Sequence, residues 1–380
     1  MFWQREVLRS GVGMTFNQTY ELDLPKTGIL GSLVLYIRSQ ENGEIFGTAR
    51  KWRLLDYISK VEVMADGSTI IKSYDGRQAL ASAYHDDLVL ATSMWRTFSN
   101  VNHRQVIPLH FGRKLMDEEY ALDLARFNQV TLKVTNDATS TQFVTDVDID
   151  VVAYFLREGN TLPKGYFREE EWRVWAPAAA AIEYNDLPTL LPIRRILLRA
   201  RPGVNTGPVR NVSTMLALMS DIDFTIRTGQ TRVYKGSLEQ LGRLSILELG
   251  RYAESLTHLM RNDEEGYDVG VGYNEHGVVA EVSSTTTPSA TSSVGGSDIQ
   301  DSIQEFKAKT VDQPLSGFWR GYGMMHNVPL FDARRPDLSD ILDPDRDKVT
   351  KVDITCASGT TVAGTGVNAE SAIILSRLVR

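Results

Sequence analysis

The sequence has a single cysteine, Cys356, among its 380 residues. One cysteine can form neither an internal disulfide nor a cysteine-based zinc site. The flanking residues Val352, Ile354 and Thr355 have the character of a β-strand. We therefore expect Cys356 to be a small, buried apolar side chain.

Long apolar runs and clusters of basic residues are also missing. The longest apolar run, residues 174–182, is interrupted by Pro177 and is much shorter than the roughly 20 residues that cross a bilayer as a helix. The chain has 41 basic and 48 acidic residues, a net charge of −7, and no block rich in Lys or Arg. We therefore expect no direct binding to nucleic acid.

The common sequence signatures of enzymes are absent as well. Residues 146–150 and 343–347 resemble the start of a calcium-binding loop, but both lack the glycine at position 6 and the glutamate at position 12, and the first fits a strand better. His85, Asp86 and Asp87 could contribute to a metal or acid–base site, but a solvated helix end is the simpler interpretation. We predict no enzyme activity, no catalytic residue, no cofactor and no metal.

An internal repeat is the strongest positive feature, because two stretches about 160 residues apart share one pattern. Leu24-Pro25 in the first copy matches Leu187-Pro188 in the second, and each pair leads into an apolar segment. Each copy then alternates apolar and polar residues on both sides of a tight turn, which is Asp66-Gly67 in the first copy and Thr228-Gly229 in the second. This pattern predicts a β-hairpin in each copy, at residues 61–76 and 222–236.

The two copies continue in the same order. A stretch of helical character follows each hairpin, with Ala79, Leu80, Ala83 and Tyr84 in the first copy and Leu238, Leu241, Leu244 and Leu249 in the second. Pro108-Leu109 then matches Pro329-Leu330, and each copy ends in a predicted strand, at residues 147–155 and 372–378.

The second copy carries an insertion. Gly76 and Pro108 are 32 positions apart, whereas Gly236 and Pro329 are 93 apart, so the insertion has 93 − 32 = 61 residues. Residues 283–296 within it are a low-complexity run of small polar residues, which we expect to be a mobile surface loop.

These patterns predict an all-β protein made of two tandem jelly-roll β-sandwich domains with short helices in connecting loops. We expect an N-terminal arm at residues 1–13, a first jelly roll at 14–157, an inter-domain connector at 158–182 and a second jelly roll at 183–380. The second roll contains the inserted surface loop, at about residues 250–320.

The arm and the connector carry further expectations. The arm is either a frayed or partner-docked terminus or a short amphipathic helix. The connector is expected to pack one domain on the other through its aromatic residues, because a loose linker would leave them all in water. These residues are Tyr166, Phe167, Trp172 and Trp175.

With these paired segments and this length, residues 14–380 resemble the double jelly-roll major capsid proteins of tailless icosahedral dsDNA viruses, which include the adenovirus hexon and the coat proteins of tectivirus-like phages. The resemblance implies a virion protein made in the host cytoplasm, which assembles as a homotrimer of pseudo-hexagonal footprint and tiles an icosahedral shell. It implies neighbouring trimers, and penton or minor capsid proteins, as partners. The insertion would be an outer tower, and the arm, with Phe2, Trp3, Val7 and Leu8, would contact an inner membrane.

Two alternatives stay open. A tandem β-sandwich could bind or process carbohydrate, which requires an aromatic cleft with paired carboxylates. Trp95, Trp172, Trp175 and Trp319 could supply the aromatics, but no convincing acid pair accompanies them. A minor capsid or spike protein is the other alternative, although the repeat favours the main shell component, since a fused pair gives sixfold-like symmetry from a trimer.

Overall fold

The computed structural model describes most of the chain. The described residues are 1–40, 54–89, 91, 93–94, 102–140, 145–158, 162–201, 204–205, 218–249, 252–260, 279–284, 313–321, 324–348, 350–356, 366–367 and 370–380.

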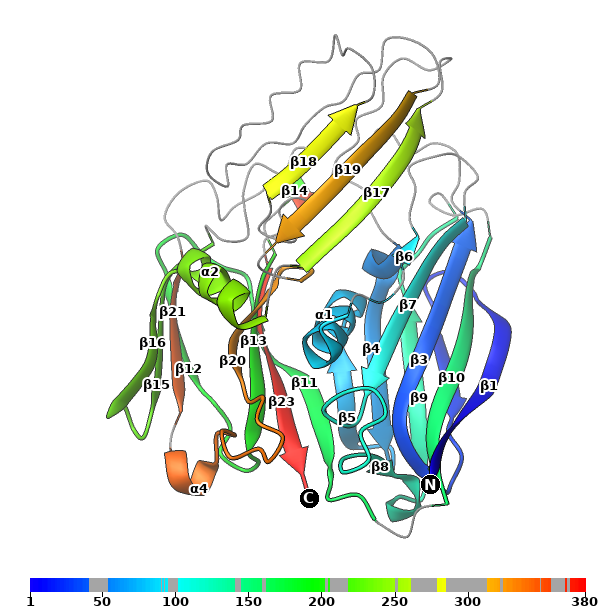
Figure 1. Ribbon diagram of the computed structural model, residues 1–380, viewed down its shortest axis with the longest axis horizontal. Helices are drawn as coiled ribbons and strands as arrows, with labels where there is room; N and C mark the ends of the chain where they lie inside the picture. The colour runs from blue at the N-terminus through cyan, green and yellow to red at the C-terminus, as the bar shows by residue number, and fades with distance from the viewer. Residues whose placement is uncertain are drawn as a thin grey trace.

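The first half of the chain forms a sandwich of two sheets, which we call the first roll (Figure 1). Its β1 sheet has the order β1 (Phe2–Met14), β10 (Val147–Arg157), β3 (Ile29–Gln40), β7 (Asn102–His110), β6 (Ser93–Met94), with β8 (Leu122–Asp123) beside β3. The facing β2 sheet has the order β2 (Thr19–Asp23), β9 (Val130–Asn136), β4 (Ile58–Ala65), β5 (Thr69–Tyr74). Two short 3₁₀ helices, at Leu54–Tyr57 and Leu124–Arg126, lie in its connections.

The second half repeats this arrangement and forms the second roll. Its β11 sheet has the order β11 (Tyr166–Trp175), β23 (Glu370–Val379), β13 (Ile193–Arg201), β20 (Asn327–Asp332), and its β12 sheet has the order β12 (Ile182–Asp186), β21 (Lys351–Cys356), β15 (Met219–Ile226), β16 (Thr231–Gly236). A short pair, β14 (Val204–Asn205) and β22 (Gly366–Val367), lies outside these sheets. Eight strands of each roll occupy corresponding places, with β6 and β8 present only in the first roll among the described residues, so the predicted repeat is confirmed.

The hairpins and helices of the two copies also match. Asp66 and Gly67 take positive φ angles of 52° and 71° between β4 and β5, and Thr228 and Gly229 take 57° and 83° between β15 and β16, as tight turns between antiparallel strands require. Helix α1 (Gly76–Asp87) then follows in the first roll and α2 (Leu238–Leu249) in the second.

Both helices begin with the same reciprocal cap. Asp75 accepts a hydrogen bond from the backbone N–H of Gln78, whose side chain accepts one from the backbone N–H of Asp75. Ser237 and Gln240 make the same exchange in α2. Asp75 and Ser237 are therefore equivalent positions, and the two helices can be compared residue by residue.

Each roll has its own apolar core between its two sheets. In β10, Val147, Ile149 and Val151 are buried, whereas the alternating Asp148 and Asp150 are partly exposed. The acidic run at 146–150 therefore leads into a strand, as predicted. Cys356 is buried on β21, also as predicted.

The predictions of an N-terminal arm and of an inter-domain connector are both wrong, because each segment contains a paired β-strand. Strand β1 pairs antiparallel with β10 from Phe2 to Met14, so this segment is neither a free arm nor a helix. The connector likewise contains β11, which pairs with β23. Both are the first strand of a roll. Two register shifts in β1, and a run of charged residues in β11, break the apolar alternation that marks a strand.

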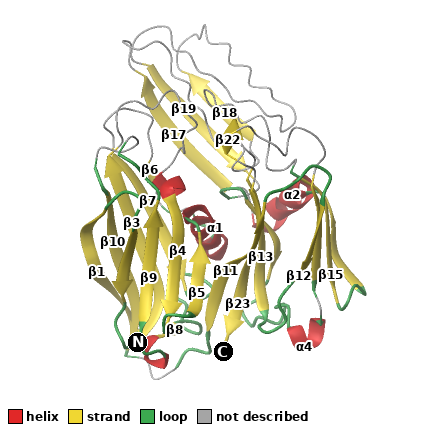
Figure 2. Cartoon of the chain, turned by 180° about the vertical axis from the view of Figure 1, so that it is seen from behind, coloured by secondary structure: helices red, strands yellow, loops and turns green. Residues whose placement is uncertain are grey.

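The insertion in the second roll contains β-strands. Strands β17 (Tyr252–Met260), β19 (Gln313–Gly321) and β18 (Val279–Ser284) form an antiparallel three-stranded sheet, which lies above the two rolls in Figures 1 and 2. The prediction of a surface loop is therefore wrong for these strands. Residues 285–296 of the low-complexity run lie outside the described residues. Within the described segments, no helix is long and apolar enough to cross a membrane.

We predict that Gly165→Ala lowers the free energy of unfolding by about 3 kcal/mol or more. Gly165 has a φ of +150°, and a Cβ there would overlap the Val379 carbonyl group. Gly67→Ala is the matched control, because its φ of +71° is unfavourable but nothing lies near the new atom, so we expect a loss of only about 1–2 kcal/mol. Equal losses in urea unfolding would contradict the role of Gly165.

Candidate functional site: the interface between the two rolls

Helix α1 is packed between the rolls (Figures 1 and 2). One side of the helix, including Ala79 and Leu80, belongs to the core of the first roll. Another side carries Gln78, Ser82 and Asp86, which recur every four residues and so lie on one face. These three polar side chains all contact the outer face of the β11 sheet, which is the face that points away from the core of the second roll.

A buried carboxylate, Glu169 on β11, is at the centre of this interface. It accepts hydrogen bonds from Lys72 Nζ at 2.8 Å, Ser82 Oγ at 2.9 Å and Arg195 Nη2 at 3.0 Å. The side chains of Lys72, Glu169 and Arg195 are at most 3% exposed. Beside Glu169, β5 and β11 pair in parallel, at Lys72 with Glu169 and at Ser73 with Glu170, and this short ladder joins the two rolls into one eight-stranded sheet.

Burial and charge act in opposite directions on these groups. Burial alone would raise the pKa of Glu169, but the adjacent Lys72 and Arg195 lower it to about 2. Burial lowers the pKa of Lys72, and Glu169 opposes that shift. Glu169 is therefore ionised at every physiological pH. The buried charge is stable because it is paired with cations from both rolls.

A second cluster lies next to the first. Asp86 accepts hydrogen bonds from Arg194 at 2.7 Å and Arg195 at 2.8 Å. The guanidinium of Arg194 also lies 4.9 Å from the centre of the Phe167 ring, and Phe167 packs against Tyr120 of the first roll. This packing confirms the predicted contact between domains for Phe167.

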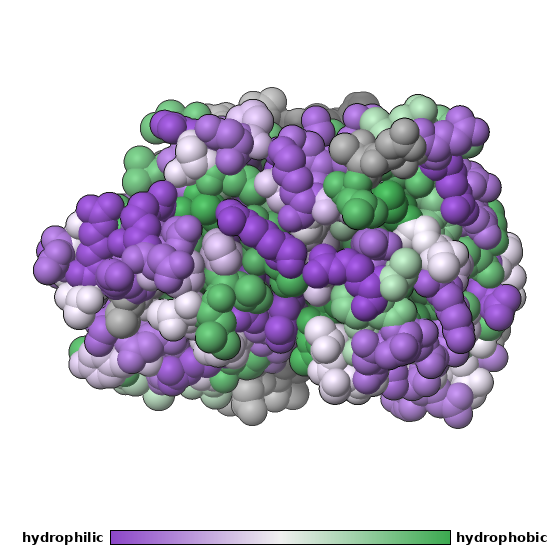
Figure 3. All heavy atoms as spheres, turned by 90° about the horizontal axis from the view of Figure 1, so that it is seen from below, coloured by the Kyte–Doolittle hydropathy of each residue, from purple (hydrophilic) through white to green (hydrophobic). Residues whose placement is uncertain are grey.

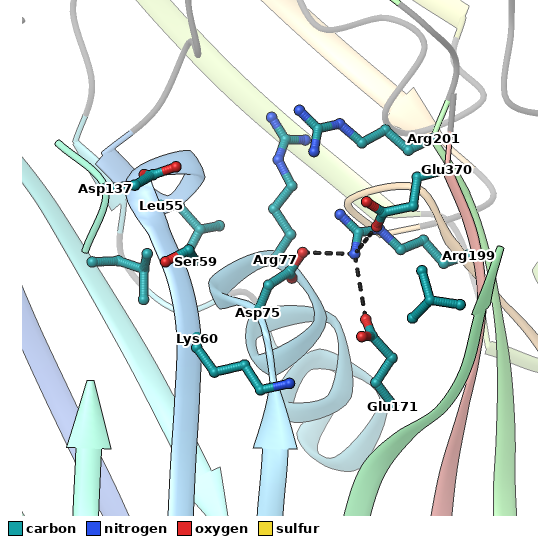
Figure 4. A pocket seen from close by; sticks show the side chains of 12 residues that line it. Leu55, Ser59, Lys60, Asp75, Arg77, Asp137, Glu171, Arg199, Arg201 and Glu370 are labelled. Atoms are coloured by element: carbon teal, nitrogen blue, oxygen red, sulfur yellow. Dashed lines mark ion pairs between the residues drawn. The ribbon is translucent and has the colours of Figure 1, made fainter. Parts of the chain in front are cut away.

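The interface also contains a pocket of about 250 Å³ between the rolls, shown in Figure 4. Arg199 lies in it among three carboxylates, 2.6 Å from Asp75, 2.9 Å from Glu370 and 3.7 Å from Glu171. Burial raises the pKa of Glu171. The pocket is lined by Leu55, Ile58, Ser59, Lys60, Asp75, Arg77, Asp137, Glu171, Val174, Arg199, Arg201 and Glu370. Since acidic and basic groups balance and no aromatic ring lines it, it provides no platform for a sugar.

His85, Asp86 and Asp87, the candidates for a metal or acid–base site, contact different partners and do not form one site. His85 is buried, and neither of its ring nitrogens has a hydrogen-bond partner among the described residues. Its pKa is well below 6.5 because of burial and the nearby Arg195 and Arg334. Asp86 binds arginines, and Asp87 lies 2.9 Å from His110 Nε2. The solvated helix end predicted for these residues is therefore wrong. Among the described residues, no cluster of potential ligands could hold a metal ion.

Among the described side chains, Trp172 and Trp175 lie in different surroundings. Trp172 is 40% exposed and lies beneath the Arg377 guanidinium, whereas Trp175 is partly buried against the second core. Tyr166 is buried in the first core, which confirms a predicted contact between the domains. Trp95 and the side chain of Trp319 lie outside the described residues. The acidic run 343–347 forms the short helix α4 (Pro344–Asp347), capped by Asp343.

Sequence patterns missed the central residues of the interface. Lys72, Glu169 and Arg195 are charged residues inside strands, at positions that alternation assigns to an outer face. The outer face of an isolated sandwich meets water. Charged residues are ordinary there, so the sequence gives no reason to place these three at an interface. Arg194-Arg195 between Ile193 and Ile196 was the one available hint, because paired charges are uncommon inside an apolar strand.

The sequence matches no protein-family model and no curated protein, but solved structures match over the whole chain. The STIV MCP, the major capsid protein of Sulfolobus Turreted Icosahedral Virus, gives a TM-score of 0.61 at 9% identity and covers 100% of this chain and 97% of that chain. A chain from the atomic structure of that virus gives 0.58 at 10% identity, covering 99% and 90%. PBCV-1 VP54, fitted into a reconstruction of the virophage Sputnik, gives 0.51 at 9% identity, covering 99% and 94%.

These similarities and the duplicated sheets assign the fold: the chain is a double jelly roll of the kind found in viral major capsid proteins. The resemblance seen in the sequence is confirmed at the level of the fold. At 9–10% identity the likeness concerns the fold alone.

We predict that Glu169→Gln lowers the free energy of unfolding by about 3–5 kcal/mol, because it leaves Lys72 buried without a counter-charge and leaves Arg195 with Asp86 alone. Glu21→Gln is the matched control. Glu21 pairs with Lys133 at 2.7 Å on the surface, where an ion pair contributes less than about 1 kcal/mol. Chemical unfolding at neutral pH distinguishes the two, and similar losses would show that the buried carboxylate does not hold the rolls together.

We also predict that His85→Leu makes the protein less sensitive to acid. The folded pKa of His85 is depressed, so below pH 6.5 the unfolded chain takes up a proton that the folded chain does not. Stability then falls by up to about 1.4 kcal/mol per pH unit as the pH drops, until the folded pKa is reached. His85→Leu removes this contribution. Unfolding of both proteins between pH 7 and pH 5 measures it, and identical pH slopes would contradict the prediction.

Proposed function

We propose that this protein is the major capsid protein of an icosahedral virus, with a structural and not an enzymatic role. The observation that carries the proposal is the shared fold with the STIV MCP over 97% of that chain. Both rolls take part in this likeness, because it covers 100% of this chain. The protein would act in the capsid shell of the virion, after synthesis in the host cytoplasm.

The interface between the rolls suits this role. A shell protein must keep a fixed shape while many copies press against one another. The buried pairs Lys72–Glu169 and Arg195–Asp86 tie the rolls at one relative orientation, because separating them would leave unpaired charges in a dry interface. A rigid unit of two similar rolls can form a ring of six rolls from three chains. We therefore propose a homotrimer with a pseudo-hexagonal outline.

Further partners belong to the same proposal. Neighbouring trimers would make the lattice, with penton or minor capsid proteins at its vertices and edges, and the sheet of β17, β18 and β19 would be the outer tower. The opposite end carries both termini, and Figure 3 shows this end covered largely by hydrophilic side chains, with hydrophobic ones in smaller patches. Contact with an inner membrane would therefore be confined to a few residues, such as the exposed Met1 and Phe2.

The test is the mass of the purified protein by light scattering, with negative-stain images of the same sample. We expect a species of three chains with a hexagonal outline. A protein that stays monomeric at high concentration would overturn the proposal. Screening of glycans would then address the carbohydrate-binding alternative.

A further inference from the structure

Helix α2 is the counterpart of α1, but it lacks the partner that α1 has. Aligned from the equivalent caps Asp75 and Ser237, Gln78 corresponds to Gln240, Ser82 to Leu244, His85 to Leu247 and Asp86 to Glu248. In α1 these positions are covered by the second roll. In α2 all four are exposed, and Leu247 is 83% exposed.

The β1 sheet is, in the same way, the counterpart of the β11 sheet. The strand pairings fix the equivalence: Val34 pairs with Pro108 and Val152, as Leu197 pairs with Pro329 and Ile374. Leu197 and Ile374 are buried beneath the first roll, at 1% and 2% exposed. Val34 and Val152 are half-buried on an outer face that the described part of the second roll does not cover.

The same register relates the first strands of the two sheets. Val7 pairs with Val152 as Glu171 pairs with Ile374, so Val7 corresponds to Glu171. Arg5 corresponds to Glu169, because they pair with Tyr154 and Ser376, which occupy equivalent positions. Val7 is 62% exposed, and Arg5 lies exposed over the ring of Tyr154.

The exposed faces of α2 and of the β1 sheet differ in polarity from their counterparts, α1 and the β11 sheet. Within the chain, a polar helix face meets a polar sheet face, through Gln78 with Glu171 and Ser82 with Glu169. At the corresponding places, α2 has Leu244 and Leu247, and the β1 sheet has Val7, Val34, Tyr36, Val152 and Tyr154. Leu244, Leu247 and Val7 are thus apolar where their counterparts are polar, Val34 and Val152 are apolar like their counterparts, and Arg5 is charged like Glu169. Apolar positions on both surfaces are expected of two surfaces that bind each other.

We propose that the outward face of α2 in one chain packs on the outer face of the β1 sheet in a second copy, repeating between chains the contact that α1 makes with the β11 sheet. The contact is head-to-tail, because the two surfaces differ and lie on opposite rolls, and three such contacts would close the ring of three chains proposed above. This inference rests on the self-assembly proposed above. It adds which surfaces meet and in what register.

The first test compares assembly of two variants. Leu244→Asp/Leu247→Asp alters the helix face and Val7→Asp alters the sheet face. These side chains are 48%, 83% and 62% exposed in the single chain, so we expect normal folding by circular dichroism. Each variant should raise the concentration for half-assembly by more than about tenfold, since a charge placed in a desolvated interface is strongly unfavourable. Leu190→Asp, 89% exposed in the β12–β13 connection, is the control and should assemble normally.

Mixing the two variants tests the head-to-tail geometry. Each retains one intact surface, so the mixture should form a species of two chains, although neither variant self-associates. A short bismaleimide should also join chains carrying Gln240→Cys to chains carrying Val7→Cys, because Gln78 contacts Glu171 at the equivalent place.

The outcomes separate this inference from the proposed function. If the wild-type protein forms trimers and both variants do too, with no cross-linking, the inference is wrong and the capsid function stands. If the wild-type protein stays monomeric at every concentration, both are wrong. Loss of trimers in the variants but not in Leu190→Asp, with two-chain species on mixing, would support the inference.

Discussion

Glu169 is a carboxylate closed off from water that is held by cations from both halves of the chain, Lys72 from the first roll and Arg195 from the second. A buried carboxylate is stable only with its partners in place, so the two rolls cannot turn or slide against each other without exposing or unpairing it. Arg195 also binds Asp86 on α1, which ties the helix into the same network. The fixed angle between the rolls, and hence the shape of the unit that they form together, follows from this cluster.

The contacts between the rolls inside the chain are mainly charged, whereas those inferred between chains are mainly apolar. A network of buried charges needs accurate geometry, which one folding chain can provide because its parts are already tethered. Apolar surfaces are less demanding in geometry and associate favourably by exclusion of water, which suits chains that meet after folding. The replacement of Ser82 and His85 in α1 by Leu244 and Leu247 in α2 fits this distinction. The two rolls therefore share one architecture but differ in their outer surfaces.

Sequence patterns predicted much of this fold, because they report on cores and turns. The paired hairpins, helices and Leu-Pro segments revealed two rolls, and the matched Pro108 and Pro329 occupy equivalent places on β7 and β20. The same patterns failed where a strand does not alternate between core and water. Strand β11 is charged on the face that meets the first roll, so it resembled a connector, and β1 has two register shifts. The buried site around Glu169 was missed because its charges become neighbours only when the rolls pack together.

The most direct test of this account is a cryo-EM map of the assembled protein at side-chain resolution. We predict that each chain keeps Glu169 between Lys72 and Arg195, and that Leu244 and Leu247 of one chain lie against Val7 and the β1 sheet of the next. A map in which α2 faces solvent, or in which the β1 sheet is covered by another element, would contradict it.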